Sequence, residues 1–196
     1  QYAPELLGRQ ETRRLLDALA ETHPKTVEEA TPKVLSLGET QRVLQNLLRE
    51  RVPIRDLATI LEAITDVGVV THDVNALTEA ARSALARTIS GNLANENGEL
   101  SVVTLDPHLE TQIAERFGLL GGAGEQKIEP EFGKQLLEKI EVACQSGVMS
   151  QPIVLCSTMI RPHLRKLTER FLPNLEVIAH GEVSSNVQLV TMGTVS

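Results

Sequence analysis

The apolar positions in the first half of the chain recur with a helical period. Between Leu6 and Ile89 they are spaced three and four residues apart, and strand-like alternation of apolar and polar positions is absent. Four stripes result: Leu15-Leu16-Leu19, Val43-Leu44-Leu47-Leu48, Ile54-Leu57-Ile60-Leu61-Ile64 and Leu77-Ala81-Ala84-Leu85-Ile89. Amphipathic helices bury such stripes against one another. We therefore expect an N-terminal all-α helical bundle domain.

Local signals mark some of the helix ends. Ser36 and Glu39 have the spacing of a capping box, in which each side chain bonds the backbone of the other residue at a helix start. Pro53 is expected in the first turn of the third helix, where proline sacrifices no hydrogen bond. A further short helix is expected around residues 27–30.

A polar segment separates the two halves. Residues 91–98 are rich in Asn and Gly, which favour turns, and they contain no apolar period. We predict an all-α domain over residues 1–91, a linker over 92–98 and a second domain over 99–196.

Strand-like and helix-like segments alternate in the second half. Apolar runs predict strands over residues 100–105, 153–156, 175–179 and 187–192. Helices are expected over 107–117, 130–144 and 162–171, the first with Asp106 as its N-cap and Pro107 at its first position. Strand–helix–strand order predicts parallel pairing through right-handed crossovers. The fold class is therefore mixed α and β, with a small C-terminal α/β domain whose sheet has three to four mostly parallel strands.

Composition and charge exclude several classes of protein. The 196 residues are 41% hydrophobic, which is enough for a core, so intrinsic disorder is not the dominant state. The formal net charge is −7, and the aromatic residues are one Tyr and three Phe, which disfavours nucleic-acid binding. The two cysteines fit a reducing compartment. No run reaches the roughly 18 apolar residues of a membrane span, and the chain begins at Gln1, so we expect a soluble piece of a longer protein.

The pair Cys156 and Arg161 is the strongest candidate for chemistry. Cys156 ends an apolar strand just before a helix, and Arg161 follows at a spacing found in anion-binding loops of some sulfurtransferases. Such loops usually contain glycine, whereas Met159 and Ile160 stand here, which favours packing over anion binding. We expect a structural thiol, with a Cys-dependent enzyme as the alternative.

Other motifs predict no catalytic, cofactor-binding or metal-binding residue. The glycines between residues 118 and 124 follow a helix, and Glu125-Gln126 come next where a phosphate-binding loop needs Lys and Ser or Thr. The five histidines lack metal-ligand spacing. The sequence predicts a non-enzymatic protein without a cofactor.

Four arginines form a candidate subunit interface. Arg42 and Arg49 are seven residues apart, on one face of the second helix, and Arg51 and Arg55 flank Pro53. A solvated surface, with Glu50 and Asp56 as local partners, is the simpler interpretation. The alternative is an ionic contact to another subunit, because the guanidinium group binds carboxylates in a bidentate manner.

Several segments resemble one known family along nearly the whole chain. They are ELLGRQETRRLLD at 5–17, QRVLQNLLRERVPIRDLATILE at 41–62, PIVLCS at 152–157 and PNLEV at 173–177, with Ile160-Arg161, Leu164-Arg165, Leu167 and Glu169-Arg170 between the last two. These segments closely resemble the cytosolic region of flagellar type III export-gate proteins, the FlhA family. The injectisome export gates share this layout and are the alternative, but Cys156-Ser157 and Glu169-Arg170 are more similar to the flagellar members.

The resemblance implies a role in flagellar biosynthesis and type III protein transport. Family members have an N-terminal membrane region, then a cytosolic region of four parts that forms a nonameric ring on the cytoplasmic side of the bacterial inner membrane. This chain would hold the helical third part, which makes ring contacts, and the α/β fourth part. The implied partners are other copies of the chain, flagellar export chaperone–substrate complexes, and the export ATPase complex with its stalk. Contact with the membrane would run only through the missing N-terminal region.

Overall fold

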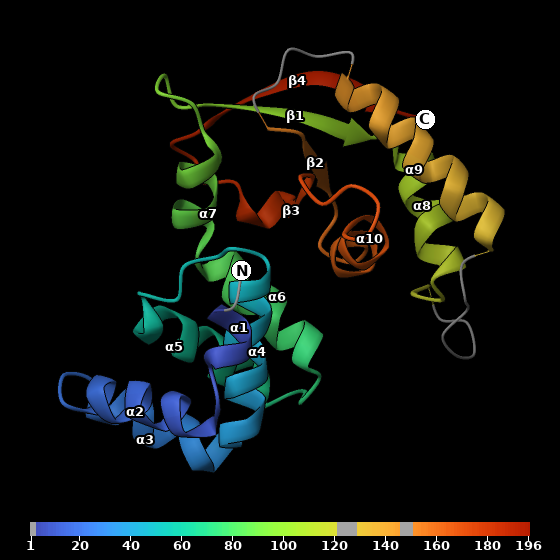
Figure 1. Ribbon diagram of the computed structural model, residues 1–196. Coiled ribbons are helices and arrows are strands. Elements are labelled where there is room, and N and C mark those ends of the chain that lie inside the picture. Colours follow the sequence, from blue (N-terminus) through green and yellow to red (C-terminus); the bar gives the residue numbers. More distant parts are fainter. Residues whose placement is uncertain (1–2, 121–128, 146–150) are drawn as a thin grey trace. The chain divides into compact units, whose positions relative to one another are not determined.

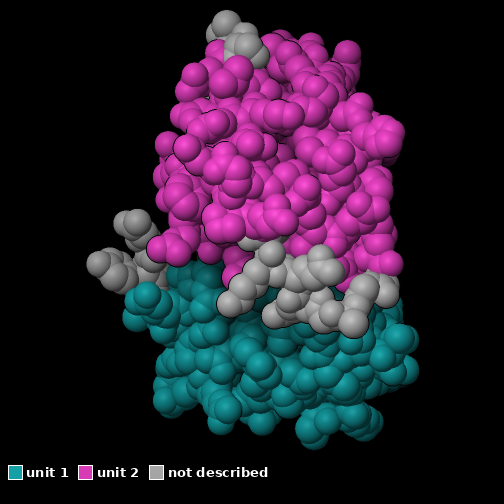
Figure 2. Space-filling view, turned by 90° about the vertical axis from the view of Figure 1, so that its right-hand side faces the viewer, with its two compact units in different colours: residues 1–89 teal, residues 90–196 magenta. Residues whose placement is uncertain are grey.

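The computed structural model describes residues 3–120, 129–145 and 151–196. The chain divides into two compact units, Gln1–Ile89 and Ser90–Ser196, which Figure 2 distinguishes by colour. Each unit is described by itself below. Most of the glycine segment discussed above, from residue 121 onward, lies outside the described residues.

Unit 1 is built from helices, and Figure 1 labels its α-helices. They are α1 (Ala3–Leu6), α2 (Arg9–Ala20), α3 (Pro24–Glu28), η1 (Glu29–Val34), α4 (Leu37–Arg49), α5 (Leu57–Gly68), α6 (Val74–Ala84) and α7 (Ala86–Leu93). Helix α7 continues into unit 2. Leu44, Ile60 and Leu77, from three different predicted stripes, are fully buried. The predicted capping box is confirmed: Glu39 N–H donates to Ser36 Oγ at 3.2 Å, and Ser36 N–H donates to Glu39 Oε2 at 2.7 Å.

Three of the predicted helix boundaries in unit 1 are wrong. Pro53 lies outside α5, because Asp56 is the N-cap and accepts a hydrogen bond from Thr59 N–H at 3.2 Å. The fourth stripe is divided between α6 and α7, since Leu85 between them has φ −89° and ψ 15°. The short helix expected at 27–30 is α3, which begins earlier, at Pro24.

The junction between the halves is partly helical. Helix α7 continues through Asn92 and Leu93, the first two residues of the predicted linker 92–98. A turn follows, in which Asn95 Oδ1 accepts hydrogen bonds from the backbone N–H groups of Asn97 and Glu99, both at 2.9 Å. Gly98 has φ +78°, a conformation that glycine adopts without steric cost.

Unit 2 contains a four-stranded parallel sheet in the order β3-β2-β1-β4. Its elements are β1 (Glu99–Leu105), α8 (Pro107–Arg116), α9 (Pro130–Gln145), β2 (Ile153–Cys156), α10 (Arg161–Thr168), β3 (Glu176–Ala179), η2 (His180–Glu182) and β4 (Gln188–Val195). The predicted mixed fold with a mostly parallel sheet is confirmed. Asp106 caps α8 as expected, since its Oδ1 accepts from His108 N–H at 2.8 Å. Helix α10 ends at Thr168 and not at Phe171, because the backbone turns there and Phe171 N–H donates to the Thr168 carbonyl.

Helices α8, α9 and α10 contribute to one apolar core with the sheet. Val103, Val154 and Val177, from three neighbouring strands, are buried in the same cluster as Ile113, Ile140 and Leu164 from the three helices. Residues that alternate with them, such as Leu100 and Leu155, are also buried, at 0% and 2% exposure. Burial on both faces is typical of an all-parallel sheet and explains the unbroken apolar run of β2.

Candidate functional site

The candidate thiol is enclosed in the core of unit 2. Cys156 is fully buried at the end of β2, and its Sγ donates a weak hydrogen bond to the Ile178 carbonyl of β3 at 3.7 Å. The next backbone amide, Ser157 N–H, donates to Glu110 Oε1 of α8 at 2.9 Å. An anion cradle would need this amide, and a carboxylate already occupies it. A buried cysteine of this kind fits a structural role.

Arg161 pairs with a carboxylate from another part of the unit. Its side chain is 1% exposed, and its Nε lies 3.6 Å from Oε1 of Glu182, which is equally buried. Its Nη1 also donates to the Val177 carbonyl at 3.4 Å. The sequence analysis gave Arg161 the role of an anion holder only in the alternative enzyme hypothesis, and it missed Glu182, which lies in η2 beyond β3. Ile160 packs in the core as expected, but Met159 is 51% exposed, so only one of these two apolar residues fills the turn.

The four candidate interface arginines are all exposed at the surface of unit 1. Arg42 Nε donates to the Gly38 carbonyl at 3.2 Å, and Arg49 Nη1 donates to Asn46 Oδ1 at 2.9 Å. Both of these bonds stay within α4. Arg51 has φ +57° in the turn after α4, and Arg55 precedes the N-cap of α5. The structure therefore places these side chains on α4 and on the connection to α5.

The carboxylates expected to neutralise these arginines are bound elsewhere. Glu50 Oε2 pairs with Nη1 of the buried Arg82 in α6 at 2.9 Å, and Asp56 caps α5. Among the described residues, none of the four arginines forms an ion pair with a carboxylate within 4 Å. The interpretation as a solvated surface therefore lacks Glu50 and Asp56, the two local partners that it assumed for the arginines. The Glu50–Arg82 pair joins residues 32 positions apart, and no local signal could have revealed it.

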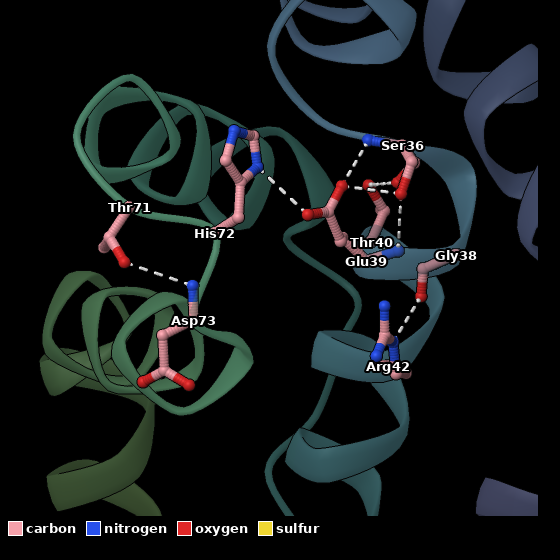
Figure 3. A network of polar contacts seen from close by, with 8 residues as sticks. All are labelled: Ser36, Gly38, Glu39, Thr40, Arg42, Thr71, His72 and Asp73. Carbon is pink, nitrogen blue, oxygen red and sulfur yellow. Dashed lines mark hydrogen bonds and ion pairs between the residues drawn. The ribbon is translucent and has the colours of Figure 1, made fainter.

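A polar network fixes the start of α4, one turn before Arg42 (Figure 3). Glu39 Oε2 accepts from Ser36 Oγ at 2.6 Å, and Glu39 Oε1 lies 3.0 Å from His72 Nδ1 in the loop between α5 and α6. The hydrogen bonds from the Ser36 hydroxyl and backbone N–H lower the pKa of Glu39, and the neighbouring His72 adds to this shift. The network joins two segments of unit 1 and so positions the α4 surface that carries Arg42.

Comparison with protein families and curated relatives gives matches along almost the whole chain. The model of the FHIPEP family matches residues 1–188. The flagellar biosynthesis protein FlhA of Bacillus subtilis is 39% identical over 100% of this chain and 29% of its own length. The FlhA of Salmonella typhimurium is 36% identical over 100% of this chain and 28% of its own length. The chain thus spans less than a third of these relatives.

Solved structures share the fold of the whole chain. The nonameric SctV-C of EPEC matches with a TM-score of 0.84 at 30% identity, covering 98% of this chain and 58% of that one. The nonameric cytosolic domain of EscV, from a type III secretion system, matches with a TM-score of 0.80 at 30% identity, covering 99% and 57%. Chlamydia pneumoniae CdsV, solved with CdsO, matches with a TM-score of 0.87 at 26% identity, covering 99% and 57%. Every helix in the described ranges is too short or too polar for a membrane span.

Proposed function

The chain belongs to the FHIPEP family, and from this premise we propose that it is a docking and ring-forming module of a flagellar type III protein export gate. One observation carries this proposal: relatives with the same fold along 98–99% of the chain assemble as nonamers. The flagellar relatives named above are 36–39% identical, against 26–30% for the secretion-system structures, which favours the flagellar over the injectisome gate.

The arginine face of unit 1 is our candidate for the contact between neighbouring subunits. In a ring, each interface is heterologous, so a face on one subunit meets a different face on the next. Arg42, Arg49, Arg51 and Arg55 are exposed, and no carboxylate of the described residues pairs with them. We propose that carboxylates of the adjacent subunit bind these guanidinium groups. Such a contact is ionic and exposed at its rim, so salt weakens it.

The wider role follows from the relatives and stays a proposal. CdsV has been solved in complex with CdsO, so this fold can carry a bound protein. We propose that the module helps to receive flagellar export chaperone–substrate complexes and the export ATPase complex with its stalk. It would work on the cytoplasmic side of the bacterial inner membrane, held there by a region outside this chain, because the relatives are about three times longer.

We propose a function without catalysis. Two contacts support this: the Cys156 thiol lies inside the core, and Arg161 is held by Glu182. The Cys-dependent alternative requires a thiol that reacts with alkylating reagents in the native state. Rapid alkylation of Cys156 in the folded chain, measured by mass spectrometry, would revive that alternative.

Ring assembly of the longer parental protein tests the arginine interface. The double variant Arg42→Glu/Arg49→Glu should lose nonamers in sedimentation or mass photometry, and cells that carry it should lose motility. The matched control is Arg13→Glu/Arg14→Glu, which reverses two exposed charges on α2 and should keep both. Normal rings and motility in the Arg42→Glu/Arg49→Glu protein would remove the interface assignment.

A further inference from the structure

We propose that the outer face of α5 is the second half of the ring contact and binds the arginine face of the adjacent subunit. The inference rests on the proposed function, in which copies of the chain form a ring. The α5 face consists of Glu62 and Asp66 in the helix and of Val69 and Val70 directly after it. A ring needs a second face, because a heterologous contact joins two different surfaces of the same chain.

The α5 face carries negative charge that its own helix does not neutralise. Glu62 and Asp66 are four residues apart, so they share one side of α5, opposite the fully buried Ile60 and Ile64. Both residues are exposed, and the helix contains no basic residue. Glu62 Oε1 accepts a hydrogen bond from Thr26 Oγ1 at 3.4 Å. Within the part of the chain that the structure describes, neither carboxylate has a basic partner within 4 Å.

This charge is unfavourable for α5 by itself. Like charges four residues apart on a helix repel each other. Asp66 also lies in the last turn, where the helix dipole is negative and where α5 has no basic residue. A cation from outside the helix would relieve both effects. The arginine face has guanidinium groups without carboxylate partners, so the two faces are complementary in charge.

Two valines extend the α5 face beyond the carboxylates. Val69 is seven residues after Glu62, and therefore on the same side, and its exposure is 73%. Val70 is 87% exposed. Subunit interfaces combine apolar contacts with polar groups, and the methylene stems of arginine cover apolar surface. The α5 face thus offers the arginines of a second copy both a charged and an apolar contact.

The two faces belong to different helices of unit 1, which Figure 1 labels. Helices α4 and α5 both pack against α6. Arg42 and Arg49 lie on the side of α4 opposite the buried Leu44, as Glu62 and Asp66 lie opposite the core on α5. One subunit can therefore use its arginine face toward one neighbour and its α5 face toward the other. Relatives with this fold assemble as nonamers, which makes a second copy the occupant that we propose.

Helix α2 carries the competing acidic surface. Asp17 and Glu21 are exposed and are also four residues apart, at the end of α2. Arg13 and Arg14, however, precede Asp17 by four and three residues, so the same helix supplies positive charge beside it. None of the large apolar side chains of α2 is exposed. These differences favour α5 and make Asp17 and Glu21 the matched control.

Charge reversal in the longer parental protein tests the α5 face. Glu62→Arg/Asp66→Arg should abolish nonamers in mass photometry, because two basic faces then meet. The control Asp17→Arg/Glu21→Arg makes the same change of charge at the same spacing and should keep them. Circular dichroism checks that both variants fold. Nonamers in the folded Glu62→Arg/Asp66→Arg protein would overturn the inference.

Exchange of the charges tests whether the two faces touch each other. The quadruple variant, which combines Glu62→Arg/Asp66→Arg with Arg42→Glu/Arg49→Glu, should form nonamers again, because opposite charges meet once more. An equimolar mixture of the two double variants should also associate, since each supplies the charge that the other lacks. No recovery in the quadruple variant would show that the faces do not pair.

The same variants separate this inference from the proposed function. Loss of nonamers with Arg42→Glu/Arg49→Glu alone would keep the arginine interface and overturn the α5 face. Nonamers in both double variants would remove both assignments. If Glu62→Arg/Asp66→Arg keeps nonamers and cells lose motility, the α5 face binds a different protein and a second copy is not its occupant.

Discussion

The two units leave different groups open to a binding partner. In unit 1 these are the guanidinium groups of four exposed arginines, and in unit 2, as far as the described residues go, they are the backbone groups on the outer side of β4, the end strand of the sheet. A charged face selects a partner by its carboxylates and loses affinity in salt. A strand edge selects a partner by its extended backbone. The two units therefore offer a partner two different kinds of contact, one ionic and one through backbone hydrogen bonds.

Both units also bury an arginine–glutamate pair, and the pairs differ in exposure. In unit 2, Arg161 and Glu182 are each 1% exposed. In unit 1, the Arg82 side chain is 3% exposed, but its partner Glu50 is 17% exposed. Removing one member of a buried pair leaves a charge without compensation, and this costs more where water cannot reach it.

The largest expected effect is therefore on the unit 2 pair. Arg161→Met should lower the free energy of unfolding by about 3–5 kcal/mol, because it removes the guanidinium group that lies beside the buried Glu182 carboxylate. Arg82→Met should cost less, since water reaches Glu50. Urea unfolding measures both. The double variant Arg161→Met/Glu182→Leu should recover most of the loss, and a double variant no more stable than the single one would contradict this account.

The next effect concerns close packing in unit 1. A Cβ on Gly68 would lie 2.7 Å from Leu35 Cδ2 and 3.0 Å from Val34 Cγ1, so Gly68→Val should cost about 1–3 kcal/mol by overpacking. At Gly91, in α7, the equivalent Cβ would have no atom of the described residues within 4 Å apart from its chain neighbours and the backbone of its own helix. Gly91→Ala is the control and should leave stability unchanged or raise it by up to about 1 kcal/mol. Thermal unfolding that is equally affected by both changes would contradict the packing explanation.

A smaller effect is expected at the start of α4. Ser36→Ala removes the cap and should cost about 0.5–2 kcal/mol at pH 7. The lowered pKa of Glu39 means that its contribution is complete above its unfolded pKa and is lost as the pH falls through its folded pKa. The difference between Ser36→Ala and the wild type should therefore shrink below about pH 4. Unfolding at several pH values measures this, with the exposed Ser83→Ala as the control. A constant difference down to pH 3 would contradict the linkage.

The smallest effect on folding, and the sharpest test of the comparison, comes from the surface arginines. Arg42→Glu/Arg49→Glu should change the free energy of unfolding by less than about 0.5 kcal/mol, because both side chains are exposed. Raising the salt concentration from about 0.05 M to about 0.5 M should nevertheless weaken ring assembly, because the proposed contact is ionic. Ring assembly that is insensitive to salt over this range would contradict the ionic contact.

Short-range signals predicted most of the elements. The stripes located α2, α4 and α5, and the capping residues Ser36 and Asp106 lie where their spacing placed them. The break at Leu85 escaped prediction, because Leu85 and Ile89 are both buried and the stripe continues across it. The predicted start of α5 at Pro53 was wrong for a similar reason. A proline is allowed in the first turn of a helix, but the N-cap at Asp56 decides where α5 begins.

The sequence alone thus determined the fold class, the exposure of the four arginines and the burial of Cys156, because periodicity and residue type are local properties. Only the tertiary structure decided which charged residues form ion pairs and which strand lies at the edge of the sheet. Glu50 and Arg82 are 32 residues apart, and β4, the last strand of the chain, pairs with β1, the first. Such contacts depend on how distant segments pack together, and the local pattern of apolar and polar residues does not specify that packing.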